Sequence, residues 1–221
     1  MTKLTMTVFA CLFASMLLAC ACGAATQSHS CSIPGGYTNW TDYLSVPQFD
    51  SSLGTLNSVT IDLDGHIAGV AKLESLDQDS SEISTTITGT VVVSGLGSVS
   101  SVSASPVASL TQSVTAYDGV LDWGGTSGAT LGYSANASNS ALLTAPGDLA
   151  NFIGTGLVSL PVAGSGKSKA MGPGNFRAEI TTQASANVTV IYDYAVPEPS
   201  SLLGLGSCLL GAGGFLLRRR R

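Results

Sequence analysis

Short alternating runs rich in Val, Ile and Thr, separated by Gly, Ser and Asn, constrain the fold of this 221-residue chain more than any other feature. Such runs favour half-buried strands, and no 3.6-residue helical period is sustained. Residues 59–63 alternate, Asp64 and Gly65 offer a two-residue hairpin turn, and residues 66–73 continue as the predicted return strand. Further strands are predicted at residues 82–94, 98–103, 112–117, 129–133, 157–162, 177–183 and 186–194. We therefore expect an all-β fold, a single antiparallel β-sandwich.

One helical turn is expected within this β-rich chain. Residues 145–153 place Asp148 where its side chain could cap a short helix that carries Leu149, Phe152 and Ile153. No internal repeat is evident, so a single domain is expected between the two ends of the chain.

The N-terminal residues have the three parts of a secretory signal peptide. Lys3 supplies the positive charge, residues 8–18 form the apolar region, and small residues follow at 19–25. We therefore assign residues 1–25 to a signal peptide, with cleavage between Ala21 and Thr26. An alternative is that residues 17–20 act as a lipobox, in which Cys20 would be acylated.

The C-terminal residues join a stiff peptide to an uncharged span. Two prolines fix their own φ and favour extended neighbours, so residues 196–199 should be an accessible, extended segment. Residues 200–217 carry no charge and contain five glycines. As a helix this span would measure about 27 Å, just enough for a hydrocarbon core of about 30 Å. We therefore predict a C-terminal transmembrane helix over residues 200–217.

Four consecutive arginines end the chain. By the positive-inside rule this basic cluster would stay in the cytoplasm and leave everything before the span outside. Its members are Arg218, Arg219, Arg220 and Arg221.

This tail resembles the PEP-CTERM protein-sorting domain, whose pattern is Val-Pro-Glu-Pro, a hydrophobic span and a terminal basic cluster. The resemblance implies an exported protein of a Gram-negative bacterium that makes exopolysaccharide, held in the inner membrane as a precursor and then delivered to the cell surface or extracellular matrix. It also implies exosortase, a membrane protease or transpeptidase, as the processing partner. The sorting motif that exosortase would recognise as substrate is Val196, Pro197, Glu198 and Pro199.

The region between the two signals, residues 26–195, is acidic. It has thirteen acidic residues and four basic ones, a net charge of −9. A surface of this sign repels nucleic acid and anionic lipid and opposes self-association, so we exclude the first two as partners and expect a monomer. Its length suits one domain with a real core.

Cysteines give no disulfide framework. Cys11, Cys20 and Cys208 belong to the two ends, which leaves Cys31 and, depending on the signal cleavage site, Cys22. A bridge between Cys22 and Cys31 would need cleavage before Cys22, and otherwise Cys31 is a single thiol near a flexible terminus.

The search for catalytic chemistry yields few candidates. His29 is expected in a disordered terminus and His66 just after a tight turn, which leaves a Ser-His-Asp arrangement without a suitable base. Residues 124–128 have Thr126 where a nucleophile elbow would need its nucleophile, so this segment is interpreted as a flexible loop. We predict no catalytic residue and no cofactor.

Two acidic segments contain the residue types that bind calcium. Alternation puts Asp62 and Asp64 on one solvent face of a strand, and later calcium ligands are missing. A denser loop could bind Ca²⁺ weakly, although solvated turn charges are the favoured interpretation and no metal site is predicted; it contains Glu74, Asp77, Asp79 and Glu82.

Aromatic residues are the best candidates for a binding face, because exposed rings stack on sugars. Core packing is the favoured alternative for them. They are Tyr37, Trp40 and Tyr43 near the start and Trp123 in the 117–125 loop.

Residues 46–194 also resemble a choice-of-anchor domain of the type called choice-of-anchor E. The similar segments are residues 49–56, before the 59–63 strand, and residues 148–156, before residues 160–162. The resemblance implies a bacterial surface domain and no activity. In such a sandwich Phe49 and Leu53 would close one end, Gly54 would turn the chain into the first strand, and Phe152 would cover the other end.

Two functions of different classes remain. The first is a non-catalytic surface or extracellular-matrix protein that is sorted and processed by exosortase, with exopolysaccharide as a further candidate partner. The second is a secreted carbohydrate-binding module or weak hydrolase presented by the same anchor. Convergent aromatic rings or a carboxylate pair in a cleft would favour the second.

Overall fold

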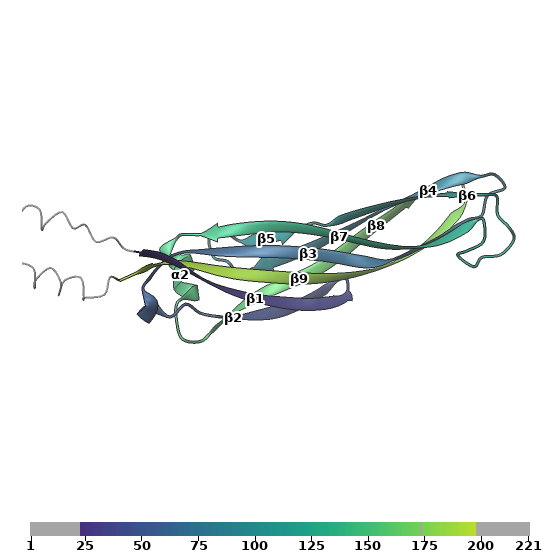
Figure 1. Cartoon of the computed structure of the whole chain (residues 1–221). Helices are drawn as coiled ribbons and strands as arrows, with labels where there is room; N and C mark the ends of the chain where they lie inside the picture. Colours follow the sequence, from purple (N-terminus) through teal and green to yellow (C-terminus); the bar gives the residue numbers. More distant parts are fainter. Residues whose placement is uncertain (1–22, 173, 198–221) are drawn as a thin grey trace, which may run out of the picture.

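A computed structural model describes residues 23–172 and 174–197 (Figure 1). The predicted signal peptide and the predicted transmembrane helix therefore lie almost entirely outside the described residues. Within them, no helix is long and apolar enough to cross a bilayer. The strands are β1 (Gly23–Tyr37), β2 (Trp40–Pro47), β3 (Thr55–Ser75), β4 (Ser81–Ser94), β5 (Ser101–Ala104), β6 (Val107–Val114), β7 (Gly128–Leu143), β8 (Leu157–Met171) and β9 (Phe176–Val196). Short helical segments are η1 (Ser51–Leu53), α2 (Pro146–Leu149) and η2 (Ala150–Phe152).

The strands form two antiparallel sheets packed face to face, which confirms the predicted all-β sandwich. Sheet A has the order β1-β9-β3-β7, and sheet B has the order β2-β8-β4, with β5 and β6 both paired to β4. β5 and β6 act as one strand interrupted at Pro106, whose carbonyl accepts a hydrogen bond from Gly89 N at 2.9 Å. Sheet A places the first strand beside the last, and sheet B places β2 beside β8 and β4 beside the interrupted β5–β6 strand; this strand order is that of a jelly roll.

The domain is a rod, because its central strands are unusually long. β3 and β9 each have 21 residues and pair along their whole length, which corresponds to about 70 Å. Gly23 pairs with Val196, so both termini leave at the same end. We call this end, with η1, α2 and η2, the proximal end (Figure 1). The distal end carries the loops 76–80 and 115–127 and the connection from β8 to β9.

The core follows the period-2 pattern along the rod. The inward side chains Ile61 and Leu63 of β3 are fully buried in one cluster with Val91 of the facing sheet and Val188 of β9, and Ile67 is fully buried in a second cluster with Ile87. The largest cluster fills the proximal part, and two smaller ones continue toward the distal end.

The predicted hairpin at Asp64 and Gly65 is wrong. Both residues lie inside the continuous strand β3, where Asp64 pairs with Asn187 on one side and Ser138 on the other. Gly65 is buried, and a Cβ there would lie 3.2 Å from Ala104 Cβ. A close approach between the sheets, and not a turn, explains this glycine. The two strands predicted at 177–183 and 186–194 are likewise one strand, β9.

The prediction of a disordered N-terminal segment is also wrong. β1 pairs with β9 from Gly23 to Tyr37, so His29 and Cys31 lie in an ordered strand. A bridge from Cys31 to a residue before Gly23 would have to cross eight strand residues, about 26 Å, whereas a disulfide needs Cα atoms within about 7 Å. The fold therefore excludes the Cys22 to Cys31 bridge within one chain.

Two expectations about the sandwich ends need correction. Phe49 and Phe152 lie at the same end, because Phe49 N donates to the Phe152 carbonyl at 2.7 Å. Leu53 is 43% exposed and closes nothing. The expected helical turn is present as α2 and η2, but Ala145 is its N-cap, and the Asp148 carboxylate instead accepts hydrogen bonds from Ser98.

Candidate functional site

The sorting motif begins where the fold ends. Val196 is the last residue of β9, and the exposed Pro197 follows it directly. Glu198, Pro199 and the cluster of Arg218, Arg219, Arg220 and Arg221 lie outside the described residues. Pairing with β1 continues to the last residue of the strand, through Ala24 with Ala195 and Gly23 with Val196. The predicted sorting motif therefore begins at the last residue of the last strand.

Aromatic packing holds β9 just before this exit. The Phe49 ring lies 4.9 Å from that of Tyr194 and 5.9 Å from that of Tyr192, and Phe152 is 6.4 Å from Tyr192. The Tyr192 hydroxyl donates to the Pro47 carbonyl at 2.7 Å. Burial raises the pKa of Tyr192 to about 12. The strand is thus fixed by a buried cluster within a few residues of the motif.

The connection from β2 to β3 crosses close to the same exit. Gly54 has φ 153°, and a Cβ there would lie 2.1 Å from the Ala195 carbonyl oxygen. The predicted turn at Gly54 is confirmed, and its reason is this close passage. Just before it, Asp50 caps η1 by accepting from Ser52 N at 2.9 Å, and this hydrogen bonding lowers the pKa of Asp50.

Asp148 ties the α2 turn to the loop after β4. Its carboxylate accepts from both the hydroxyl and the backbone N–H of Ser98, the latter at 2.9 Å. The hydroxyl bond and then the backbone bond hold the pKa of Asp148 below its ordinary value. The proximal loops are therefore fastened to each other around the exit of the tail.

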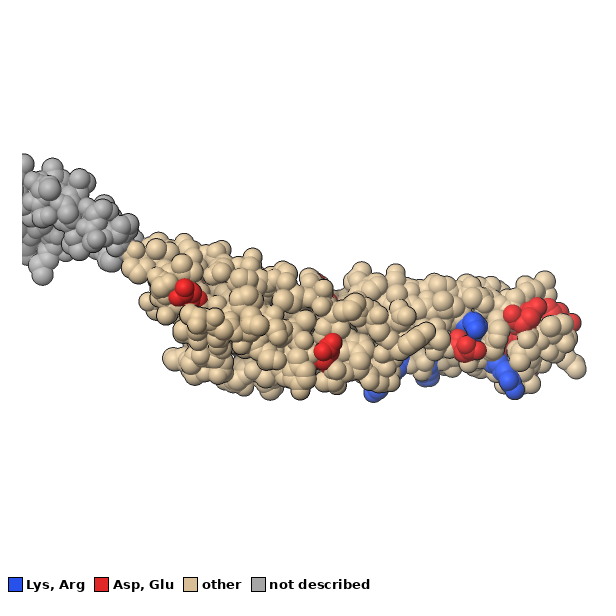
Figure 2. All heavy atoms as spheres, turned by 90° about the horizontal axis from the view of Figure 1, so that it is seen from below, with Lys and Arg blue, Asp and Glu red and all other residues tan. Residues whose placement is uncertain are grey.

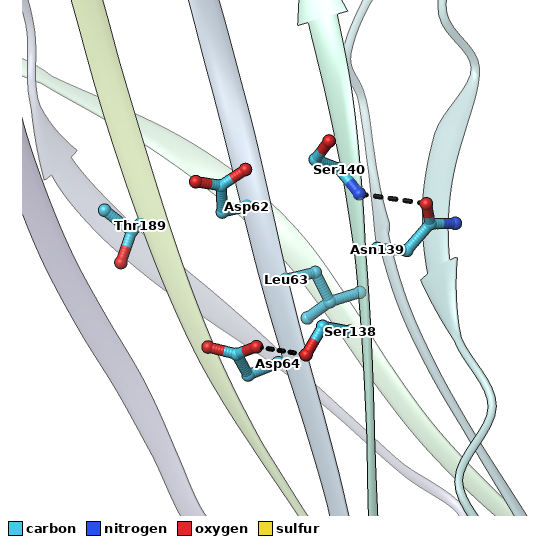
Figure 3. A pocket seen from close by; sticks show the side chains of 7 residues that line it. All are labelled: Asp62, Leu63, Asp64, Ser138, Asn139, Ser140 and Thr189. Atoms are coloured by element: carbon cyan, nitrogen blue, oxygen red, sulfur yellow. Dashed lines mark hydrogen bonds between the residues drawn. The ribbon is translucent and has the colours of Figure 1, made fainter.

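A second candidate is a shallow hollow of about 490 Å³ on the outer face of sheet A (Figure 3). Asp62 and Asp64 line it from β3, which confirms that they share the solvent face. Ser138 Oγ donates to Asp64 Oδ1 at 2.6 Å, and no hydrogen bond to the Asp62 carboxylate occurs within the described part of the chain. Asp64 is exposed and Asp62 is half-buried on this sheet surface, and among the described residues no other titratable side chain lines the hollow with them.

The acidic loop at the distal end is split by the fold. Glu74 is fully buried and accepts from Trp123 N at 2.8 Å and from Ser127 Oγ at 2.6 Å. Asp77 accepts from Asn175 N at 3.1 and 3.2 Å, and with Asp79 it lines a hollow of about 550 Å³. Over residues 23–172 and 174–197, His, Cys, Asp and Glu form no group of three or more that could hold a metal ion. Glu74 is therefore a structural residue that organises the 115–127 loop.

The predicted aromatic face is dispersed. Trp40 is half-buried, its Nε1 donates to the Ala184 carbonyl at 3.2 Å, and a Cβ at Gly164 would lie 2.4 Å from its ring. Tyr37 and Tyr43 are 72% and 64% exposed, but they lie on the outer faces of sheets A and B. Trp123 is at the distal end with φ 61°. The four rings do not converge on one surface.

Neither histidine is placed for acid–base catalysis. His66 lies mid-strand on β3, and not after a turn as predicted, with Nδ1 2.6 Å from Asn136 Oδ1. His29 Nε2 lies 3.0 Å from Gln27 Nε2, and its ring packs 6.0 Å from that of Tyr192. No hydrogen bond joins either ring to a Ser or Asp in the described chain.

Charged side chains gather toward the distal end, as Figure 2 shows for one face. All four described basic residues are on that part of the rod: Lys72, Lys167, Lys169 and Arg177. Lys72 and Glu179 form an exposed ion pair at 3.1 Å. The proximal end thus carries no Lys or Arg among the described residues.

The solved structures that match this chain do so only weakly. A Desmodium yellow mottle tymovirus chain has 8% identity and a TM-score of 0.22, and the match covers 83% of this chain and 94% of that one. The turnip yellow mosaic virus structure has 8% identity and a TM-score of 0.20, and the match covers 82% of this chain and 99% of that one. The VP2 subviral particle of infectious bursal disease virus has 10% identity and a TM-score of 0.20. That match covers 81% of this chain and 43% of that one, so this chain spans less than half of it. Such scores support no functional argument.

A search of curated protein sequences gives no significant match. A family model, the PEP-CTERM protein-sorting motif, matches residues 195–221. The match begins at Ala195, within the last residues of β9, and includes the predicted span and basic cluster. The chain therefore ends in a PEP-CTERM sorting motif, the type of tail that marks an exosortase substrate and a membrane-anchored precursor destined for the cell surface or extracellular release.

Proposed function

We propose that this protein is a non-catalytic surface or extracellular-matrix protein of a Gram-negative bacterium. Its precursor is held in the inner membrane by residues 200–217, and exosortase recognises Val196, Pro197, Glu198 and Pro199. The observation that supports this most strongly is the sorting-motif match at 195–221, which starts at the edge of a rigid domain. The folded domain is the part that is exported and displayed on the cell surface. It is a monomer and resembles a choice-of-anchor E domain in this role.

The geometry suits recognition of the tail by a membrane enzyme. The domain is rigid up to Val196, because β1 pairs with it and the Phe49 cluster packs behind it. A proline favours extended neighbours and has no N–H to donate to a strand pairing, so the Pro-Glu-Pro sequence is suited to a stiff peptide that an enzyme could bind. In this proposal Glu198, the single carboxylate of the motif, supplies a charged contact.

Replacement of Pro197, Glu198 and Pro199 with alanine tests this proposal. The unprocessed precursor should accumulate in the membrane of the native host, because the stiffness and the carboxylate are lost while the span and arginines remain. Ser200→Ala with Ser201→Ala is the matched control and should be processed normally. Immunoblots of membrane and released fractions distinguish precursor from product, and normal processing of the triple variant would overturn the assignment of substrate residues.

A carbohydrate-binding role is the second candidate, supported by the outer face of sheet A. Hydroxyl, amide and carboxylate side chains form rows across its four strands, namely Ser30, Thr189, Asp62 and Ser140, and then Ser32, Asn187, Asp64 and Ser138. The Asp62 carboxylate could accept hydrogen bonds from sugar hydroxyls. Gel mobility in the presence of dextran tests this: retardation should be lost in Asp62→Ala with Asp64→Ala and kept in the control Asp42→Ala. Equal mobility with and without dextran would reject it.

A further inference from the structure

Three exposed aliphatic side chains lie at the end from which the tail leaves, as others do at the distal end, where Val120 is 56% and Leu121 40% exposed. Leu53 is 43% exposed, Ile153 39% and Leu157 65%, and they come from separate segments of the chain. The Phe49 to Ile153 bridge and the Leu157 to Pro47 pair bring two of these segments beside the exit, while Leu53 precedes Gly54, which touches Ala195. The outer face of sheet A between the two ends carries mostly Ser, Thr, Asn and Asp, together with Leu142, which is 59% exposed.

The length of chain beyond the fold limits what can cover these side chains. Three residues, Pro197 to Pro199, separate Val196 from Ser200, where the uncharged span begins. The four steps along the chain from Val196 to Ser200 reach at most about 14 Å when fully extended. A precursor anchored by that span therefore keeps its proximal end within about 14 Å of the bilayer. The segment that carries the signal peptide leaves from the same end, since Gly23 pairs with Val196.

The charges at this end indicate which kind of surface it fits. All described Lys and Arg residues lie toward the distal end, so the proximal end cannot attract anionic lipid. Its carboxylates Asp50, Asp148 and Asp193 already accept hydrogen bonds, from Ser52 N, from Ser98, and from Asn57 Nδ2 at 3.2 Å. Contact must then depend on apolar side chains entering the interfacial region, which an uncharged or zwitterionic surface permits.

We infer that the proximal end is a docking surface for a zwitterionic lipid bilayer, formed by Leu53, Ile153 and Leu157. This rests on the proposed anchoring of the precursor by its tail. Docking holds the rod upright, with its distal loops farthest from the membrane, and keeps Pro197 at the lipid–water interface. A membrane-embedded processing enzyme would find its substrate peptide at that depth.

Photo-crosslinking of the full chain in phosphatidylcholine vesicles tests the inference. A photo-crosslinking amino acid is placed at Leu53, at Leu157 or, as control, at Val120, an exposed aliphatic residue of the distal 115–127 loop. Intact mass should show lipid adducts at the first two positions and none at Val120. Adding phosphatidylglycerol should lower the yield at Leu53 and Leu157, because the acidic end is repelled.

The outcomes separate this inference from the function on which it rests. A chain that floats with the vesicles but gives no adduct at Leu53 or Leu157 overturns the docking surface and leaves tail anchoring intact. A chain that does not float with them overturns the anchoring itself, and the docking surface with it. A yield unchanged by phosphatidylglycerol would contradict the assignment to a zwitterionic surface.

Discussion

Removal of the Glu74 carboxylate should loosen the distal end. The carboxylate is fully buried and binds two donors, the backbone N–H of Trp123 and the hydroxyl of Ser127. Trp123 has φ 61°, a conformation that costs a non-glycine residue about 1 kcal/mol or more and is retained here because its N–H is bound. The loop conformation therefore depends on one side chain.

The size of the effect follows from these contacts. A hydrogen bond to a charged group contributes about 1.5–3 kcal/mol to stability, and a buried donor left without an acceptor costs about 1–3 kcal/mol. Since the two bonds are coupled, Glu74→Ala should lower the free energy of unfolding by about 3 kcal/mol. Glu74→Gln keeps the shape and one acceptor, so about 1 kcal/mol is expected. The exposed Glu82 is the matched control, and Glu82→Ala should change stability by less than about 0.5 kcal/mol.

Urea unfolding followed by tryptophan fluorescence measures these differences, and hydrogen exchange of residues 115–127 locates them. Exchange in this loop should accelerate in Glu74→Ala before the rest of the domain is affected, because its backbone hydrogen bonds open locally. If Glu74→Ala matched Glu82→Ala in both stability and loop exchange, the carboxylate would not organise the loop, and the reasoning would be refuted.

Three further predictions concern the packing of the sandwich. Because the pKa of Tyr192 is raised to about 12, the stability that this side chain contributes should be present below pH 10 and lost as the pH rises toward 12. Tyr192→Phe should cost about 1 kcal/mol of stability at neutral pH. Thermal melts of this variant should show a smaller loss of stability at alkaline pH than those of the unmodified protein. Gly164→Ala should destabilise by about 1–3 kcal/mol, because a Cβ would overlap the Trp40 ring, and a red-shifted Trp emission would report ring displacement. Asp148 has a lowered pKa, so the stability that its carboxylate contributes should be present above its ordinary pKa of 3.8 and lost as the pH falls below that value. Thermal melts across this pH range should show no such loss in the double variant Ser98→Ala with Asp148→Asn.

Local sequence was sufficient for the strand character of most of the chain. The alternation of residues 59–63 correctly placed Asp62 and Asp64 on the solvent face, and the strand predicted at 82–94 corresponds to β4. Neither β1 nor β2 was predicted. β1 is rich in Ser and Gly and Ile33 is its one buried residue, whereas β2 is a short strand that buries Leu44 and Val46. Tyr192 and Tyr194 follow Val188 and Val190 at every second position. This alternation was the sequence signal that could have predicted the aromatic cluster next to the tail.

The sequence by itself determined the sorting tail, the acidic charge and the β-rich architecture, because motif order, ionisable residues and two-residue periodicity are local properties. Only the tertiary structure decided that Asp64 and Gly65 continue a strand, that Phe49 and Phe152 share one end, and that Glu74 is buried. Each depends on partners far away in the chain, such as Asn187 beside Asp64 or Ser127 over Glu74. The pairing of Gly23 with Val196 is of the same kind: two residues 173 positions apart meet because a jelly roll places its first and last strands side by side.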